Sequence, residues 1–185
     1  MFELGPAAQE MSRLVSGLRD DHLDYPTPCP DWTVADLLAH VHQFATVFTH
    51  NARKSQARPP EDLVDDWRVA IPDQLDDLAR AWRVDSAWQG RVSAGGVEMD
   101  AQDNAVVRIE ERTMRGWDLA RATSQDLHVD DARLDQVDQF FELFAEQIAA
   151  GEGPFGPAVS PPERATRLES IVARTGREPS SQAAR

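Results

Sequence analysis

Residues 111–123 read Glu111-Arg112-Thr113-Met114-Arg115-Gly116-Trp117-Asp118-Leu119-Ala120-Arg121-Ala122-Thr123, an ordered row of charges with a Gly-Trp step inside it. On a helix, Glu111 and Arg115 stand one turn apart on the same side, and Asp118 continues that side. Arg108 extends the row in the other direction. The row is either a site or a salt-bridged outer face, where each pair contributes only about 0.3–0.5 kcal/mol. Periodicity alone favours the outer face, because such rows are common on bundle exteriors.

Helical periodicity continues on both sides of this row. Apolar residues recur at helical spacing in segments 4–18, 34–52, 61–82, 101–123, 132–150 and 163–174. Thr33 with Asp36 three residues on is the start signal of the second helix, and Pro72 predicts a kink or a new start inside the third. Glycines between residues 84 and 100 indicate a loop with a small hairpin.

The pattern of elements predicts the fold class. Several helices with almost no strand signal indicate an all-α protein, an up-down four-helix bundle. We expect the bundle to occupy residues 1–150. Residues 151–185 would form a short C-terminal helical extension that packs on the bundle, with a disordered end from about residue 179.

Composition excludes several classes of partner. A chain of 185 residues with a formal net charge of −13 is unsuited to nucleic acid or anionic membranes, since phosphate contacts need clustered cations. No apolar run reaches the roughly 18 residues of a membrane span. The N-terminus lacks the pattern of a signal peptide, so we expect a cytoplasmic protein. The single cysteine, Cys29, excludes an intrachain disulfide and a cysteine-based zinc cluster within one chain.

Histidine and cysteine are the first candidates for chemistry. Of five histidines, His40 and His42 lie beside the apolar face of a strongly predicted helix, and periodicity does not distinguish them. No HxxxH or HExxH spacing occurs, so the chain has no self-contained metal motif. Cys29 lies between two prolines with no basic residue close in sequence to activate it. It is therefore interpreted as a small buried residue in preference to a reactive thiol.

Three separated stretches resemble an actinobacterial metal-binding family related to the N-terminal domain of mycothiol-dependent maleylpyruvate isomerase, which belongs to the DinB-like four-helix bundles. The first runs from Thr27 through Cys29-Pro30-Asp31-Trp32 to His40, and the second is Glu111 to Thr123. The third is Phe155-Gly156-Pro157-Ala158-Val159, followed by Gly176-Arg177-Glu178-Pro179.

The resemblance implies a divalent metal, zinc or nickel, held between helices by two histidines and a glutamate. His40 matches the first ligand and Glu111 the second, so the resemblance turns the charged row inward. In thiol-dependent relatives, the metal would lower the pKa of a bound thiol and hold it as the nucleophile. The third ligand position holds Arg115, whose guanidinium does not donate a lone pair to a metal.

These features give three hypotheses of function. In the first, the metal site is remodelled and the chain binds or acts on a small carbonyl- or carboxylate-bearing metabolite. His40 would be the acid/base, Arg115 the anion or oxyanion stabiliser, and Glu111 the group that orients Arg115. The second is a working metal-dependent, mycothiol-type S-transferase or isomerase, with a low-molecular-weight thiol as partner. The third is a non-enzymatic binding or homodimerising bundle.

Overall fold

The computed structural model describes residues 3–94, 96–151 and 155–180. Its helices and strands are α1 (Gly5–Ser16), η1 (Asp20–His22), α2 (Val34–Ala52), α3 (Trp67–Ala81), η2 (Asp85–Trp88), β1 (Arg91–Ala94), β2 (Val97–Asp100), α4 (Ala101–Thr123), α5 (Asp131–Leu143), α6 (Ala145–Ala149) and α7 (Arg167–Arg174). The predicted helical fold is confirmed. The predicted hairpin is also confirmed, since β1 and β2 pair antiparallel.

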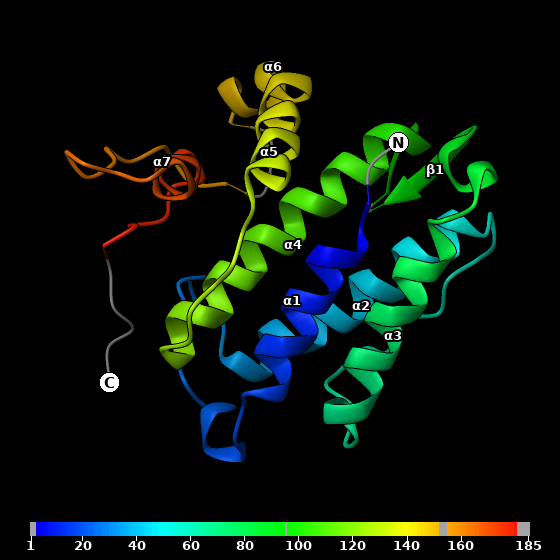
Figure 1. The fold of residues 1–185 in the computed structure, drawn as a ribbon, viewed down its shortest axis with the longest axis horizontal. Coiled ribbons are helices and arrows are strands. Elements are labelled where there is room, and N and C mark those ends of the chain that lie inside the picture. The colour runs from blue at the N-terminus through cyan, green and yellow to red at the C-terminus, as the bar shows by residue number, and fades with distance from the viewer. Residues whose placement is uncertain (1–2, 95, 152–154, 181–185) are drawn as a thin grey trace.

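Helices α1 to α4 form a four-helix bundle (Figure 1). Helix α1 packs against α3 and α4, and α2 packs against the same two helices, so α1 and α2 lie at opposite corners. One hydrophobic cluster joins Leu4 from before α1 to Phe48 and Leu78 near the ends of α2 and α3. A second cluster contains the starts of α2 and α3, with Val34 and Ile71. Helices α2 and α3 therefore run in the same direction, which refines the expected up-down bundle to up-down-down-up.

The start of α2 is set by the predicted cap. Thr33 Oγ1 accepts a hydrogen bond from the Asp36 N–H at 3.3 Å, and Asp36 Oδ2 accepts one from the Thr33 N–H at 2.8 Å. The chain before the cap folds back on itself, because the Thr27 N–H donates to the Trp32 carbonyl at 3.0 Å. This turn, tied to the first turn of α2, presents Cys29 and Trp32 toward α4.

Three predicted helix boundaries differ from the structure. Residues 61–66 are not helical, and α3 continues through Pro72, which lies in the second turn and removes only an early backbone bond. The helix expected over 132–150 is interrupted at Phe144, where φ is −110° and ψ is 20°, between α5 and α6. Helix α7 begins after Thr166, whose side chain accepts from the Glu169 N–H, and this cap defines the start.

Helices α5, α6 and α7 lie on the side of α4 away from α1 and α3 (Figure 1). Val137 of α5 and Val172 of α7 are buried in the same hydrophobic cluster as Ile109 and Trp117 of α4. The division of the chain at residue 150 stays a prediction. Of the end expected to be disordered, Pro179 and Ser180 form a turn, and residues 181–185 lie outside the described residues.

Among the described helices, none is both long enough and apolar enough to cross a bilayer.

Candidate functional site

The charged row of α4 is buried. Arg108 is 1% exposed, Glu111 8% and Asp118 0%. The outer-face interpretation of this row, which periodicity favoured, is therefore wrong. The reason is tertiary: α4 is covered by α1 and α2 on one side and by α5 on the other, so few of its faces remain for solvent.

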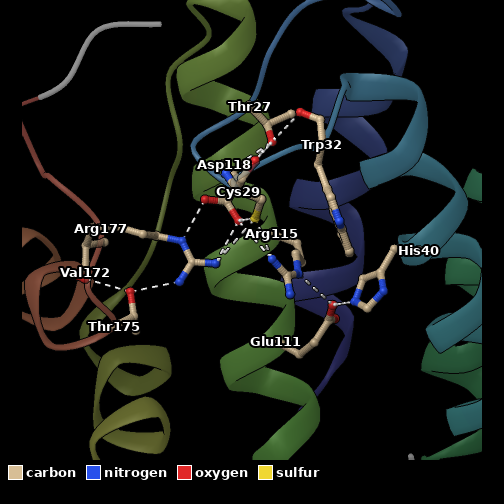
Figure 2. Close-up of polar contacts among 10 residues, drawn as sticks. All are labelled: Thr27, Cys29, Trp32, His40, Glu111, Arg115, Asp118, Val172, Thr175 and Arg177. Atoms are coloured by element: carbon tan, nitrogen blue, oxygen red, sulfur yellow. Dashed lines mark hydrogen bonds and ion pairs between the residues drawn. The ribbon is translucent and has the colours of Figure 1, made fainter. Parts of the chain in front are cut away.

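His40, Glu111 and Arg115 meet between α2 and α4 (Figure 2). His40 Nε2 lies 2.9 Å from Glu111 Oε1. The same oxygen lies 3.4 Å from Arg115 Nε in an ion pair. The three residues singled out from the sequence thus share one carboxylate oxygen.

The far end of Arg115 joins a second polar group. Its Nη1 lies 2.8 Å from Cys29 Sγ and 3.3 Å from Asp118 Oδ2. Arg177, from the C-terminal segment, donates to both oxygens of Asp118 at 2.7 and 2.9 Å. Thr175 Oγ1 accepts from Arg177 Nη1 at 2.8 Å. Figure 2 shows the resulting chain of contacts, which runs from His40 to the segment after α7.

Aromatic rings flank the solvent-facing edge of this network. The His40 ring lies 4.9 Å from the Trp32 ring and 4.2 Å from the Phe44 ring, measured between centroids. Trp32 also stacks on Arg115, with its ring centroid 5.0 Å from the guanidinium carbon. The side chains of His40 and Arg115 remain 17% and 15% exposed. Apolar walls around a few convergent polar groups are typical of small-molecule sites.

Neighbouring charges and a hydrogen bond keep Glu111 ionised although it is buried. Burial alone would raise the pKa of Glu111, but the hydrogen bond with His40 and the nearby His40, Arg115 and Arg112 charges lower it. The Glu111 carboxylate is therefore ionised at neutral pH. The ionised Glu111 carboxylate can hold the His40 imidazole in one orientation, as carboxylate–histidine pairs do in catalysis.

Cys29 is held as a thiol. Burial, followed by the Asp118 charge, raises the pKa of Cys29 to about 11, although Arg115 and Arg177 oppose this shift. The basic residues missing from its sequence neighbourhood are thus supplied by distant segments, yet they do not activate it. The interpretation of Cys29 as a buried, unreactive residue agrees with this environment.

The donor set does not fit the metal that the resemblance implies. Arg115 places a guanidinium beside Glu111 Oε1, where the third ligand would stand. Asp36 is engaged in capping Thr33, so it does not replace the missing ligand. Among the described residues, no group of three His, Cys, Asp or Glu side chains is arranged to hold a metal ion.

Sequence reasoning missed two members of the network. The sequence favours a packing role for Cys29, and it indicates no role for Arg177 beyond its place in the third family-like stretch. Gly176, with φ of +78°, turns the chain after α7 and directs Arg177 back to α4. In the sequence, the available signal was a glycine followed by an arginine directly after a predicted helix, because glycine readily adopts the left-handed conformation that turns the chain.

The burial of Glu110 predicts that the stability of the folded protein falls as pH rises. This carboxyl is 4% exposed and its Oε1 has no hydrogen-bond partner among the described residues. Burial, then the Glu111 charge, raises its pKa to about 8, with Asp118 adding to the rise and Arg177 and Arg115 opposing it. Because the folded state then binds a proton more tightly than the unfolded state, Glu110 costs stability progressively as pH rises from about 4.5 toward 8.

We expect wild type to lose on the order of 2–3 kcal/mol between pH 6 and pH 8 relative to Glu110→Gln, at about 1.4 kcal/mol per pH unit. Urea unfolding of both proteins at the two pH values measures the difference. Parallel pH profiles for the two proteins would show that Glu110 is ionised in the folded state at pH 6.

The sequence of this chain is similar to those of known proteins. A family model described as "Mycothiol maleylpyruvate isomerase N-terminal domain" matches residues 4–120. An uncharacterized protein of Mycobacterium tuberculosis, found in strains CDC 1551 / Oshkosh and ATCC 25618 / H37Rv, is 27% identical over 162 residues, covering 82% of this chain and 76% of the relative. No solved structure matches the chain significantly.

Proposed function

Because the chain belongs to the mycothiol maleylpyruvate isomerase N-terminal domain family, we propose that it uses the family's site in a remodelled form. In this form, a guanidinium stands where the family resemblance implies a metal ligand. The site binds, and acts on, a small metabolite that carries a carboxylate or a carbonyl group. The observation that carries this proposal is the position of Arg115, which lies within 3.4 Å of Glu111 Oε1.

Arg115 is the group that would bind the anionic part of the metabolite. Its Nη1 contacts Cys29 and Asp118, and its Nε lies 3.4 Å from Glu111 Oε1 without a hydrogen bond to any described residue. The Trp32 ring and the Asp118 contact hold the guanidinium in place before any ligand arrives. A fixed, partly desolvated guanidinium stabilises a carboxylate or a developing oxyanion without reorganisation.

His40 would move the proton. Glu111 Oε1 accepts from the His40 Nε2–H at 2.9 Å, which leaves Nδ1 to exchange a proton with a bound ligand. Glu111 therefore has two roles, since it fixes the imidazole orientation and balances the charge of Arg115. The rings of Trp32 and Phe44 beside His40 limit access of water to this proton.

Calorimetric titration tests the proposal. Wild type, Arg115→Gln and His40→Gln would each be titrated with pyruvate, glyoxylate and succinate, and with the neutral amide of pyruvate. We expect binding of at least one acid, weakened about 10- to 100-fold by Arg115→Gln, because the loss of a charge-assisted hydrogen bond costs roughly 1.5–3 kcal/mol. The His40→Gln protein should retain binding and lose any turnover of the bound acid.

Arg53→Gln is the matched control, since Arg53 forms an exposed ion pair with Asp77. It should bind the acids as wild type does. If Arg115→Gln lowers thermal stability and leaves acid binding unchanged, Arg115 is a structural residue and the bundle is a non-enzymatic member of its family.

A further inference from the structure

Two further arginines of α4 lie inside the bundle without a hydrogen bond to any residue that the structure describes. Arg108 is 1% exposed and Arg112 is 4% exposed. The nitrogen atoms Nε, Nη1 and Nη2 of both side chains have no hydrogen bond to any described residue. Buried guanidiniums are rare unless they are paired, because desolvation of one cation costs several kcal/mol.

The charges around this pair do not balance it. The charged group that acts on Arg108 is Arg112, which repels it, and burial together with this repulsion lowers the pKa of Arg108. Arg112 receives attraction from Glu111, but the Oε1 of Glu111 is already shared by His40 and Arg115. Two cations in the interior thus share part of one carboxylate. A protein with a net charge of −13 keeps a local excess of positive charge in its core.

Aromatic contacts compensate Arg108 only in part. Its guanidinium carbon lies 4.4 Å from the Trp82 ring centroid and 5.7 Å from that of Phe48. Trp82 is itself fixed, because its Nε1 donates to the Phe48 carbonyl at 2.9 Å. Such stacking contributes about 2 kcal/mol when desolvated. It covers the flat face of the guanidinium and leaves the N–H donors, which point outward in the plane, available to a ligand.

We propose that Arg108 and Arg112 form an internal binding site for one compact oxyanion, a phosphate or a carboxylate, held in the plane of the Arg108 guanidinium, which packs on Trp82. Two guanidiniums one helical turn apart offer fork-shaped donors that match the oxygen geometry of such an anion. The site is separate from the contacts of Arg115 with Cys29 and Asp118, and it does not depend on the proposed function.

The test uses purified full-length protein and inorganic phosphate, with acetate as a second probe. Thermal unfolding is followed as each anion replaces chloride at constant ionic strength. We expect phosphate or acetate to raise the melting temperature of wild type in a saturable manner. The response to each anion separately shows whether a phosphate or a carboxylate is preferred. A melting temperature that does not depend on either anion would overturn the proposal.

Arg112→Met separates a binding site from a structural pair. Methionine keeps most of the volume and removes the unpaired charge, so the variant should be at least as stable as wild type in chloride. We expect it to bind the responsive anion at least 10-fold more weakly. A variant that still responds to the anion as wild type does would contradict the proposal.

One control and one substitute variant complete the test. Arg53→Gln should keep the anion response, because Arg53 lies in an exposed ion pair with Asp77. If Arg112→Met fails to fold, Arg112→Lys supplies the second measurement, since it keeps the charge and loses the fork-shaped donors. We expect Arg112→Lys to weaken anion binding about 10-fold, and unchanged binding in that variant would also count against the site.

Discussion

Replacing Arg115 with histidine is expected to create a zinc site. The substitution removes the guanidinium beside Glu111 Oε1 and completes a set of two imidazoles and one carboxylate with His40. We expect close to one equivalent of zinc, bound at least about 100-fold more tightly than by wild type. This bound is conservative, because the loss of even a supporting partner of a ligand costs 10- to 100-fold in affinity.

Titration with zinc in competition with a chromogenic chelator measures the affinity, and elemental analysis of protein purified without chelator measures the content. Arg115→Ala is the matched control, since it removes the guanidinium without supplying a ligand. If Arg115→His binds zinc no better than Arg115→Ala, His40 and Glu111 are not aimed at a common metal position. If wild type already retains about one zinc or nickel per chain, the remodelled site is wrong and a metal-dependent thiol transferase becomes the better explanation.

Asp118→Asn is expected to be the most destabilising conservative change in the network. Asp118 is fully buried and pairs with Arg177 at 2.7 Å and with Arg115 at 3.3 Å. The amide would leave Arg177 in the interior without its ion-pair partner and Arg115 with Glu111 as its remaining one. Breaking a buried pair in this way costs roughly 3–5 kcal/mol, which corresponds to a fall in melting temperature of roughly 6–20 °C for a chain of this size.

Denaturant unfolding of wild type and Asp118→Asn measures this loss, and Asp77→Asn is the control. Asp77 also pairs with an arginine, Arg53 at 2.6 Å, but that pair is exposed and should contribute at most about 1 kcal/mol. Adding Arg177→Met to Asp118→Asn should recover part of the lost stability, because it removes the cation that lost its ion-pair partner. Equal losses in the two single Asp variants would show that the Asp118 network contributes no more than a surface pair.

The helices could be predicted well because their signals are local. The residues from Ala101 to Thr123 form one helix as their periodicity predicts, and the Thr33 cap starts α2 where expected. The misplaced boundaries lie where a local alternative competes. Phe144 interrupts a continuous apolar pattern, and the Thr166 cap moves the start of α7. Neither change alters the bundle that positions the site.

The direction in which the charged row faces could not be predicted from periodicity. The sequence pattern of a helix with charges at every third or fourth position is the same whether those charges face solvent or a second layer of helices. Here α1, α2 and α5 all pack on α4, so charged residues on several of its faces, such as Arg108 and Glu110, are buried. Only the family resemblance indicated that the charged row faces inward, through the match of Glu111 to a ligand of the family.

The helices, the family and three residues of the candidate site could be predicted from the sequence, because each of these depends on neighbours along the chain or on a motif. The groups that these residues contact follow from the packing of distant segments. Cys29 and Asp118 are 89 positions apart, and Asp118 and Arg177 are 59 apart. No local pattern encodes such pairings, since they arise when burial brings distant segments together and an opposite charge offsets the cost of burying the first.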